Sequence, residues 1–273
     1  MDRETTRAEI ARICAERFGD DVAAALMKRA RPGFALTPAA SEREAAGHSR
    51  HGGSAMFAPG TPWPTCDGHP LSLIAVIDTD ALAPWLDGVL PPGTGLLNFF
   101  ALDSHSEQAT DEAVGIAGTL SVASSKLGAV IAAASGEAVA VDAPKEASVF
   151  EARPWAAEPG FGFPDDWDPA FWFGELDADV MVALLGDRLA DFRELPGVIT
   201  TGDIAFGWPE LPTGGSLSME LGVDPKSLHH LLQLDGARTF TIGGEGGIMH
   251  WSIPSAALAE GDFTKAIPTP DLF

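Results

Sequence analysis

Two short apolar runs that each end in aspartate constrain the fold of this chain more than any other feature of its sequence. Leu71–Asp78 reads LSLIAVID and Leu228–Asp235 reads LHHLLQLD. Runs of this length are typical of β-strands that are buried on both faces. Each run is followed, 17 or 12 residues later, by a glycine that opens a second apolar run, at Gly95 and at Gly247. The pattern predicts two related β-rich halves.

The predicted fold class is α+β, with mainly antiparallel β-sheets in two pseudo-repeated halves and a few helices. We place the halves at about residues 52–160 and 161–273. Before them, Thr6 and Glu9 form a capping-box pattern, and Gly19 separates two stretches of helical periodicity. This pattern predicts an N-terminal helical hairpin. The expected domains are therefore the hairpin over 1–31 and one α+β domain over 32–273.

The charge of the chain is strongly negative and unevenly distributed. The net charge is −22. Residues 1–50 hold nine basic and eight acidic side chains, a net +1, whereas residues 51–273 hold eight and 31, a net −23. Between residues 51 and 125 there is no Lys or Arg. Such a field repels nucleic acids and anionic membranes and accelerates association with a basic protein. The alternative is that the acidity serves only solubility.

The sequence also indicates where the protein works and what it lacks. No apolar stretch of about 18 residues is present, and the N-terminal residues have no apolar core of a signal peptide. Two cysteines without a CxxC pair are typical of a reduced, cytoplasmic protein. A phosphate loop needs a Gly-Lys pair, which the chain does not contain. The glycine tract 243–247 therefore reads as a turn, and we expect no cofactor.

Six residues form the candidate ligand site. Asp78 and Asp235 end the two matching runs, so pseudo-symmetry could pair their carboxylates for acid–base chemistry. The alternative is that each aspartate caps the turn after its strand. The other candidates are a polar pair and two aromatic walls: Glu245, His250, Trp63 and Trp251. We expect His250 to share a face with Ile248 and to be partly buried and hydrogen-bonded.

No metal site and no catalytic residue is predicted. His48, His51, Cys66 and His69 match no standard zinc spacing. Cys66 lies in an acidic setting that raises the pKa of a thiol, which disfavours a cysteine nucleophile. The Asp165–Asp168 run departs from the calcium-loop pattern.

Several segments together resemble a known family. They are GGSAMFAPGTPWP, HPLSLIAVIDTDAL, GLLNFFAL, LLQLD, GGIMHWSIP and DFTKAIP, in that order between about residues 32 and 268. The chain resembles the YwqG-like family, bacterial domains of unknown function. That resemblance implies an α+β fold but no established reaction, so it supplies no catalytic residues. One departure is Val76, where the family has a glutamine that this chain keeps at Gln233.

Two functions remain open at this stage. We favour a non-enzymatic, acidic binding module for a basic protein partner, of the inhibitor or immunity-protein kind, with exposed Trp-Pro segments. The alternative is an enzyme or small-ligand binder with an acidic pocket between the two halves. The oligomeric state is left open.

Overall fold

One curved sheet of eleven strands organises the molecule, a computed structural model that describes residues 2–121, 124–164, 188–212, 217–235 and 247–272. The strand order is β15-β14-β13-β12-β1-β10-β2-β6-β7-β8, with β11 beside β10. Every pairing along this path is antiparallel, and only β10 and β11 pair in parallel. The fold is therefore a mixture of helices and strands with a mostly antiparallel sheet.

The elements of the described chain have the following bounds. The strands are β1 (Arg31–Pro38), β2 (Arg50–His51), β3 (Ala55–Phe57), β4 (Thr65–Cys66), β5 (His69–Pro70), β6 (Ser72–Asp78), β7 (Leu96–Ala101), β8 (Gly128–Ala133), β9 (Val139–Val141), β10 (Arg153–Gly162), β11 (Val198–Ile199), β12 (Asp203–Phe206), β13 (Leu228–Asp235), β14 (Gly247–Pro254) and β15 (Ile267–Leu272). The helices are α1 (Arg3–Phe18), α2 (Asp20–Arg29), α3 (Thr79–Leu86), α4 (Asp111–Ala117), α7 (Arg188–Arg193), α8 (Leu217–Leu221) and α9 (Ser255–Glu260), with short 3₁₀ turns η1 (Ser125–Leu127), η2 (Pro225–Ser227) and η3 (Phe263–Lys265).

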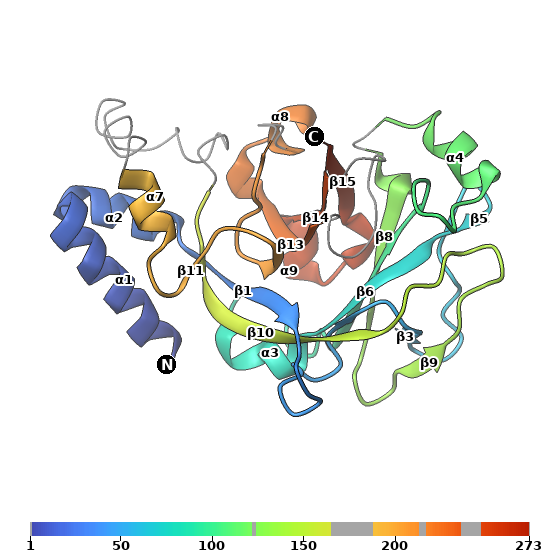
Figure 1. Cartoon of the computed structure of the whole chain (residues 1–273), viewed down its shortest axis with the longest axis horizontal. Helices are drawn as coiled ribbons and strands as arrows, with labels where there is room; N and C mark the ends of the chain where they lie inside the picture. The colour runs from blue at the N-terminus through green and yellow to red at the C-terminus, as the bar shows by residue number, and fades with distance from the viewer. Residues whose placement is uncertain (1, 122–123, 165–187, 213–216, 236–246, 273) are drawn as a thin grey trace.

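The sheet curves until its two edge strands, β8 and β15, lie next to each other (Figure 1). Gly128 permits this approach, because a Cβ atom there would lie 3.1 Å from Cβ of Pro268. Inside the curve, the ring centroids of Phe99 and Trp251 are 5.6 Å apart, and Trp251 Nε1 donates to the carbonyl of Phe100 at 3.2 Å. The strands that are far apart in the sheet order therefore share one core.

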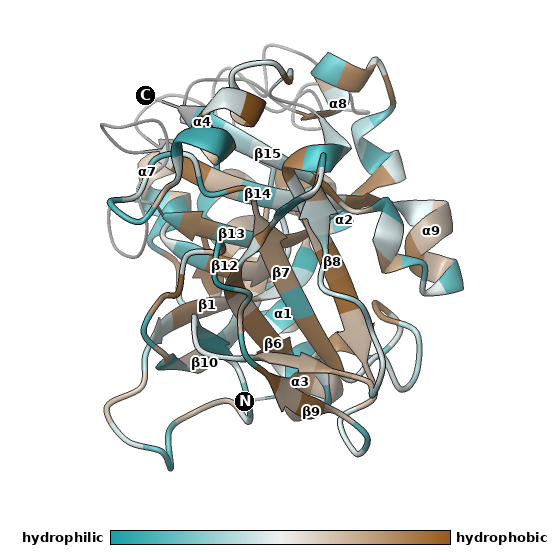
Figure 2. Ribbon diagram, turned by 90° about the vertical axis from the view of Figure 1, so that its right-hand side faces the viewer, coloured by the Kyte–Doolittle hydropathy of each residue, from teal (hydrophilic) through white to brown (hydrophobic). Residues whose placement is uncertain are grey.

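Alternation along the strands divides the apolar side chains between two clusters. The concave face carries the larger cluster, which includes Ile77, Leu97, Leu234 and Trp251. The other face of β6 and β7 carries a second cluster around Phe100, which the β3–β9 ladder helps to cover. Figure 2 shows β6 and β7 as largely hydrophobic along their length, as expected for strands buried on both sides.

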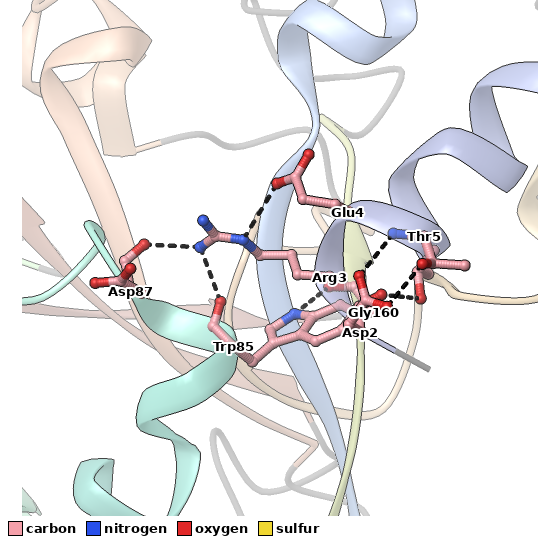
Figure 3. Close-up of polar contacts among 8 residues, drawn as sticks. Asp2, Arg3, Glu4, Thr5, Trp85, Asp87 and Gly160 are labelled. Atoms are coloured by element: carbon pink, nitrogen blue, oxygen red, sulfur yellow. Dashed lines mark hydrogen bonds and ion pairs between the residues drawn. The ribbon is translucent and has the colours of Figure 1, made fainter.

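The N-terminal helices pack on the sheet rather than standing apart from it. Ile10 and Cys14 of α1 belong to the same core cluster as the sheet. Arg3 Nη1 donates to the carbonyls of Trp85 and Asp87, at 3.0 and 2.7 Å, at the end of α3 (Figure 3). The side chain of Asp2 caps α1 by accepting from the Thr5 amide, so the helix starts one turn before the expected capping box.

The hairpins β6–β7 and β13–β14 have the same internal geometry. Asp78 pairs with Leu96, the residue after Gly95, and Asp235 pairs with Ile248, the residue after Gly247. Both ladders shift register around the residue four positions before the aspartate, Ile74 in one and Leu231 in the other. Their common geometry follows from the common pattern of apolar residues in the two runs.

The apolar runs Val130–Ala134 and Ala138–Val141 on either side of Ser135-Gly136 predict a hairpin, and this prediction is wrong. Strand β8 pairs with β7, and β9 pairs with β3 instead. Only Ala138 and its neighbours turn back toward Ala134, through backbone hydrogen bonds to the Ala134 carbonyl. Apolar character identified both strands, but it does not specify which partner a short strand takes.

Candidate functional surface and the predicted site residues

Asp78 caps helix α3. This is the second of the two roles that the sequence left open for it. Its Oδ1 accepts from the Ala81 amide at 3.1 Å, and its Oδ2 accepts from the His48 amide at 2.9 Å. Its own amide donates to Ser49 Oγ at 3.0 Å, and the residue is 6% exposed. The carboxylate therefore ties the start of α3 to the loop before β2.

Replacing this cap has a predictable cost. We expect Asp78→Ala to lower the free energy of unfolding by about 2 kcal/mol, because two backbone amides lose their acceptor. Asp80→Ala is the matched control, since Asp80 is exposed and its carboxylate accepts from Ser135 Oγ at the surface. Urea denaturation of both variants measures the difference, and equal midpoints would rule out a capping role.

Asp235 lies on a different part of the sheet from Asp78. Four strands, β12, β1, β10 and β2, separate β13 from β6 in the sheet order. The Asp235 amide donates to Asp203 Oδ1 at 2.9 Å. Each aspartate is thus held by its own neighbours. A ligand site that uses both of them stays a prediction.

A polar face surrounds Asp235 on strands β12 to β15. Gln233 is fully buried, accepts from the Glu210 amide at 2.8 Å and donates to the Gly202 carbonyl at 2.8 Å. His250 lies directly across from Gln233 in the ladder and from Thr269 on its other side. Asp235 lies two residues after Gln233 on the same strand, so the structure brings His250 and Asp235 to one face, as expected for neighbouring strands. The pKa of Glu210, near this face, is raised mainly by desolvation, and nearby Asp235 raises it further.

Two histidines are buried on this face. His230 and His250 are 4% and 5% exposed, with ring centroids 5.9 Å apart. The Nδ1 atom of His230 lies 3.1 Å from the Phe206 carbonyl. The prediction of a hydrogen-bonded His250 is wrong for the described residues, among which neither of its ring nitrogens has a partner. Burial lowers the pKa of His230 to about 4, and that of His250 well below its ordinary value.

Acidification should therefore destabilise the protein through His230. The unfolded chain binds a proton near pH 6.5, whereas the folded chain resists protonation down to about pH 4. Stability is highest above pH 6.5 and falls as the pH drops toward 4. We expect His230→Gln to lose less stability than the wild type between pH 7.5 and 5, and the exposed His105→Gln to behave as the wild type. Urea titrations at both pH values provide the measurement, and equal losses in all three proteins would contradict this assignment.

The two candidate tryptophans differ in burial. Trp63 packs against Phe100 at 5.3 Å between ring centroids, and its Nε1 donates to the Leu71 carbonyl at 2.7 Å. The segment at Trp63 is therefore only partly exposed, because the half-buried ring packs against the second apolar cluster while Pro62 is exposed. Trp251 is fully buried on the concave face. Glu245, the Asp165–Asp168 run and all but the last residue of the 243–247 glycine tract lie outside the described residues.

An acidic face surrounds α4. We define the α4 face as Glu107, Asp111, Glu112, Val114 and Val149, all exposed. The side chain of Gln108 bonds both backbone groups of Val149, which brings the loop before α4 against the segment before β10. The two valines are 49% and 58% exposed. The hairpin α1–α2 and the α4 face lie at opposite ends of the long axis (Figure 1).

Metal and thiol chemistry receive no support in the part of the chain that the structure describes. It contains no group of three or more His, Cys, Asp or Glu side chains arranged for a metal ion. Burial and the neighbouring Asp67 both raise the pKa of the Cys66 thiol, as the acidic sequence context indicated. Among the same residues, no helix has the length and apolar character needed to cross a bilayer.

A cleft that the sequence did not indicate lies beside the polar face. It is lined by the loop Gly88–Pro91, by α9, and by Arg31, Phe206 and His230, among others. None of the five predicted site residues that the structure describes lines it. Phe206 and Gly207, which line it, both have positive φ angles, 62° and 74°. No spacing in the sequence marks these positions.

Comparison with known protein families gives a partial match. A family model described as a domain of unknown function, DUF1963, matches residues 49–125. That segment begins at Ser49 beside the Asp78 cap, includes β6 and β7, and contains α4 with its acidic side chains. No curated protein matches the chain.

Proposed function

We propose that the chain is a binding module that docks a basic protein on its α4 face. The proposal rests on one observation: acidic side chains and exposed apolar side chains occur together on the α4 face. Glu107, Asp111 and Glu112 surround two exposed valines, and the segment that holds these acids contains no Lys or Arg from residue 51 to 125. Carboxylates steer a basic partner during its approach, and apolar side chains contribute once water is excluded.

The inhibitor or immunity-protein kind of activity suits this arrangement. An acidic protein that neutralises a basic enzyme associates rapidly because opposite fields steer the encounter. The same field excludes nucleic acids as ligands of the α4 face, because it repels phosphates. We propose that the module works in the cytoplasm, where Cys14 and Cys66, both free and buried, remain reduced, and that it belongs with the YwqG-like proteins that its motifs resemble.

We also propose that the two hairpins are halves of a repeat with a common origin. Their registers and register shifts agree. The amide of each terminal aspartate donates to a side chain at the start of the neighbouring strand, to Ser49 just before β2 in one half and to Asp203 of β12 in the other. The two halves differ in their buried polar residues. Asn98 lies in β7 at the position that His250 occupies in β14.

Capture at two salt concentrations tests the docking proposal. The immobilised full-length protein should retain a partner of high isoelectric point at low ionic strength and release most of it at about 0.5 M salt, where charges are screened within a few ångströms. With that partner, the triple variant Glu107→Gln, Asp111→Asn, Glu112→Gln should reduce the association rate about tenfold. The control triple Glu42→Gln, Glu44→Gln, Glu158→Gln removes the same charge from other exposed positions. Equal rates for both triples, or capture that does not respond to salt, would contradict the proposal.

A further inference from the structure

Strand β9 has an open edge at the surface of the molecule. It forms a short antiparallel ladder with β3, apart from the eleven-stranded sheet. In the part of the chain that the structure describes, β9 pairs with no other strand. Figure 1 shows β9 at the rim of the molecule. The backbone groups on the open side of an edge strand are available to another chain.

The opposite edge of the ladder is closed by a side chain. Asn98 of β7 accepts from the Met56 amide at 2.7 Å and donates to the Met56 carbonyl at 2.8 Å. The backbone groups of Met56 therefore point away from β9. Residues along an antiparallel strand direct their backbone groups alternately to the two sides, so Ala55 and Phe57 are the residues of β3 that bond β9.

The same alternation identifies the outward backbone groups of β9. Val139 and Val141 direct their N–H and C=O groups to β3, and Ala140 lies between them, opposite Met56. The N–H and C=O of Ala140 therefore point to the open edge. Ala140 is exposed, and its backbone bonds no other described residue outside the ladder. An incoming strand finds one donor and one acceptor at this position.

The side chains of the ladder show what an incoming strand would cover. Val139 lies opposite Phe57, and directly opposed residues share one face of a ladder. Phe57 is 1% exposed and belongs to the second apolar cluster, whereas Val139 is 46% exposed. A strand added beyond β9 would cover Val139 if it carried apolar side chains at alternate positions.

The charges beside the open edge indicate the kind of strand. Glu137 and Asp142 flank β9 and are exposed, and residues 127–144 contain no Lys or Arg. Asp142 Oδ1 accepts from Ser54 Oγ at 3.0 Å, which holds this carboxylate at the end of the ladder. Two flanking carboxylates favour a strand with basic residues at its ends, and they disfavour a second copy of this chain, whose β9 has the same acids.

We infer that β9 binds an extended segment of another protein by strand addition. The segment has apolar residues at alternate positions and a basic residue at each end. In this mode of recognition, backbone hydrogen bonds supply affinity and alternate side chains supply specificity. The inference does not depend on the α4 face, because α4 lies well away from β9 in both views (Figures 1 and 2), and either proposal can fail without the other.

A synthetic peptide tests the inference on the full-length protein. The probe is Lys-Val-Thr-Val-Thr-Val-Lys, blocked at both ends and titrated into isotope-labelled protein by NMR. We expect saturable binding, a downfield shift of the Ala140 amide proton and slower hydrogen exchange at that amide. Replacing the central Val of the peptide by Pro, or both Lys by Glu, should weaken binding at least about tenfold.

Ala140→Pro is the decisive variant, because it removes an N–H that points to the open edge. Proline is tolerated on edge strands where the N–H does not face the partner strand, so the β3–β9 ladder should remain. We expect peptide affinity to fall at least about tenfold. The control Ala140→Thr keeps the N–H and should bind as the wild type.

A charge variant keeps the inference falsifiable if Ala140→Pro disturbs the ladder. Glu137→Gln should weaken peptide binding about threefold, the range of an exposed ion pair. The control Glu146→Gln removes the same charge from an exposed position beyond the edge and should have little effect.

Four results would each overturn the inference. The first is wild-type affinity in Ala140→Pro, and the second is equal binding of the basic and acidic peptides. The third is the absence of saturable binding, which would mean that the flanking acids only protect the edge from pairing. The fourth is self-association that Ala140→Pro abolishes, because a second copy of the chain would then occupy the edge.

Discussion

Trp251→Ala is expected to lower the free energy of unfolding by about 4 kcal/mol, the range found when a fully buried large aromatic side chain is removed. The indole is completely buried, lies 5.6 Å from the Phe99 ring between centroids and donates to the Phe100 carbonyl. Truncation therefore leaves a cavity and removes one hydrogen bond of the Phe100 carbonyl, at the point where the two ends of the curved sheet meet.

Urea denaturation followed by circular dichroism measures this loss. Trp251→Phe separates its two causes, because it retains most of the ring but not the indole N–H, and we expect it to cost about 1–2 kcal/mol. Val114→Ala, on an exposed valine, is the control for ordinary surface truncation. A loss below about 1 kcal/mol for Trp251→Ala would mean that the two sheet ends do not share a core.

Asn98→Leu is expected to cost about 3 kcal/mol or more, although leucine has nearly the same size. Asn98 is fully buried in β7. Its side chain accepts from the Met56 amide at 2.7 Å and donates to the carbonyls of Met56 and Ile131, at 2.8 and 3.0 Å. A backbone group left without a partner costs about 1–3 kcal/mol, and leucine leaves both the amide and the carbonyl of Met56 without the side chain that bonds them.

Gln108→Leu is the matched control for Asn98→Leu. Gln108 also bonds both backbone groups of one residue, Val149, but it is exposed, so water can replace its hydrogen bonds. We expect a cost below about 1 kcal/mol. The comparison of the two unfolding midpoints isolates the effect of burial. Equal costs would show that Asn98 is not the hydrogen-bonded link between β7 and β3.

Sequence patterns predicted the parts of this fold that depend on local chemistry. The apolar runs that end in Asp78 and Asp235 are strands β6 and β13, and Asp78 caps the helix that follows. Both features rest on a few consecutive residues: a run of buried side chains needs a sheet on both sides, and an aspartate before a helix accepts amide hydrogen bonds.

Features that depend on distant segments were missed. The pairing of β9 with β3 joins residues about eighty positions apart, and the apolar pattern of β9 does not identify its partner. His250 lacks the expected hydrogen bond because its neighbours across the ladder, Gln233 and Thr269, do not bond it. The cleft combines the start of β1, the loop after α3 and helix α9, and no sequence spacing connects them.

Charge was the one long-range property that the sequence expressed directly. The net charge of −23 over residues 51–273 can be counted without knowing the fold. The count alone does not say which surface carries the charge. The structure places exposed acids and exposed valines together around α4, within the segment that the DUF1963 model matches. Because acids and exposed valines share this face, we propose that the charge serves docking there and not solubility alone.

Hydrogen exchange of the full-length protein with and without its captured basic partner tests the central claim most directly. The account predicts slower exchange in residues 103–117 and 145–151, which form and adjoin the α4 face, with little change in α1 and α2 at the opposite end of the molecule (Figure 1). Protection elsewhere on the surface, with unchanged exchange around α4, would contradict it.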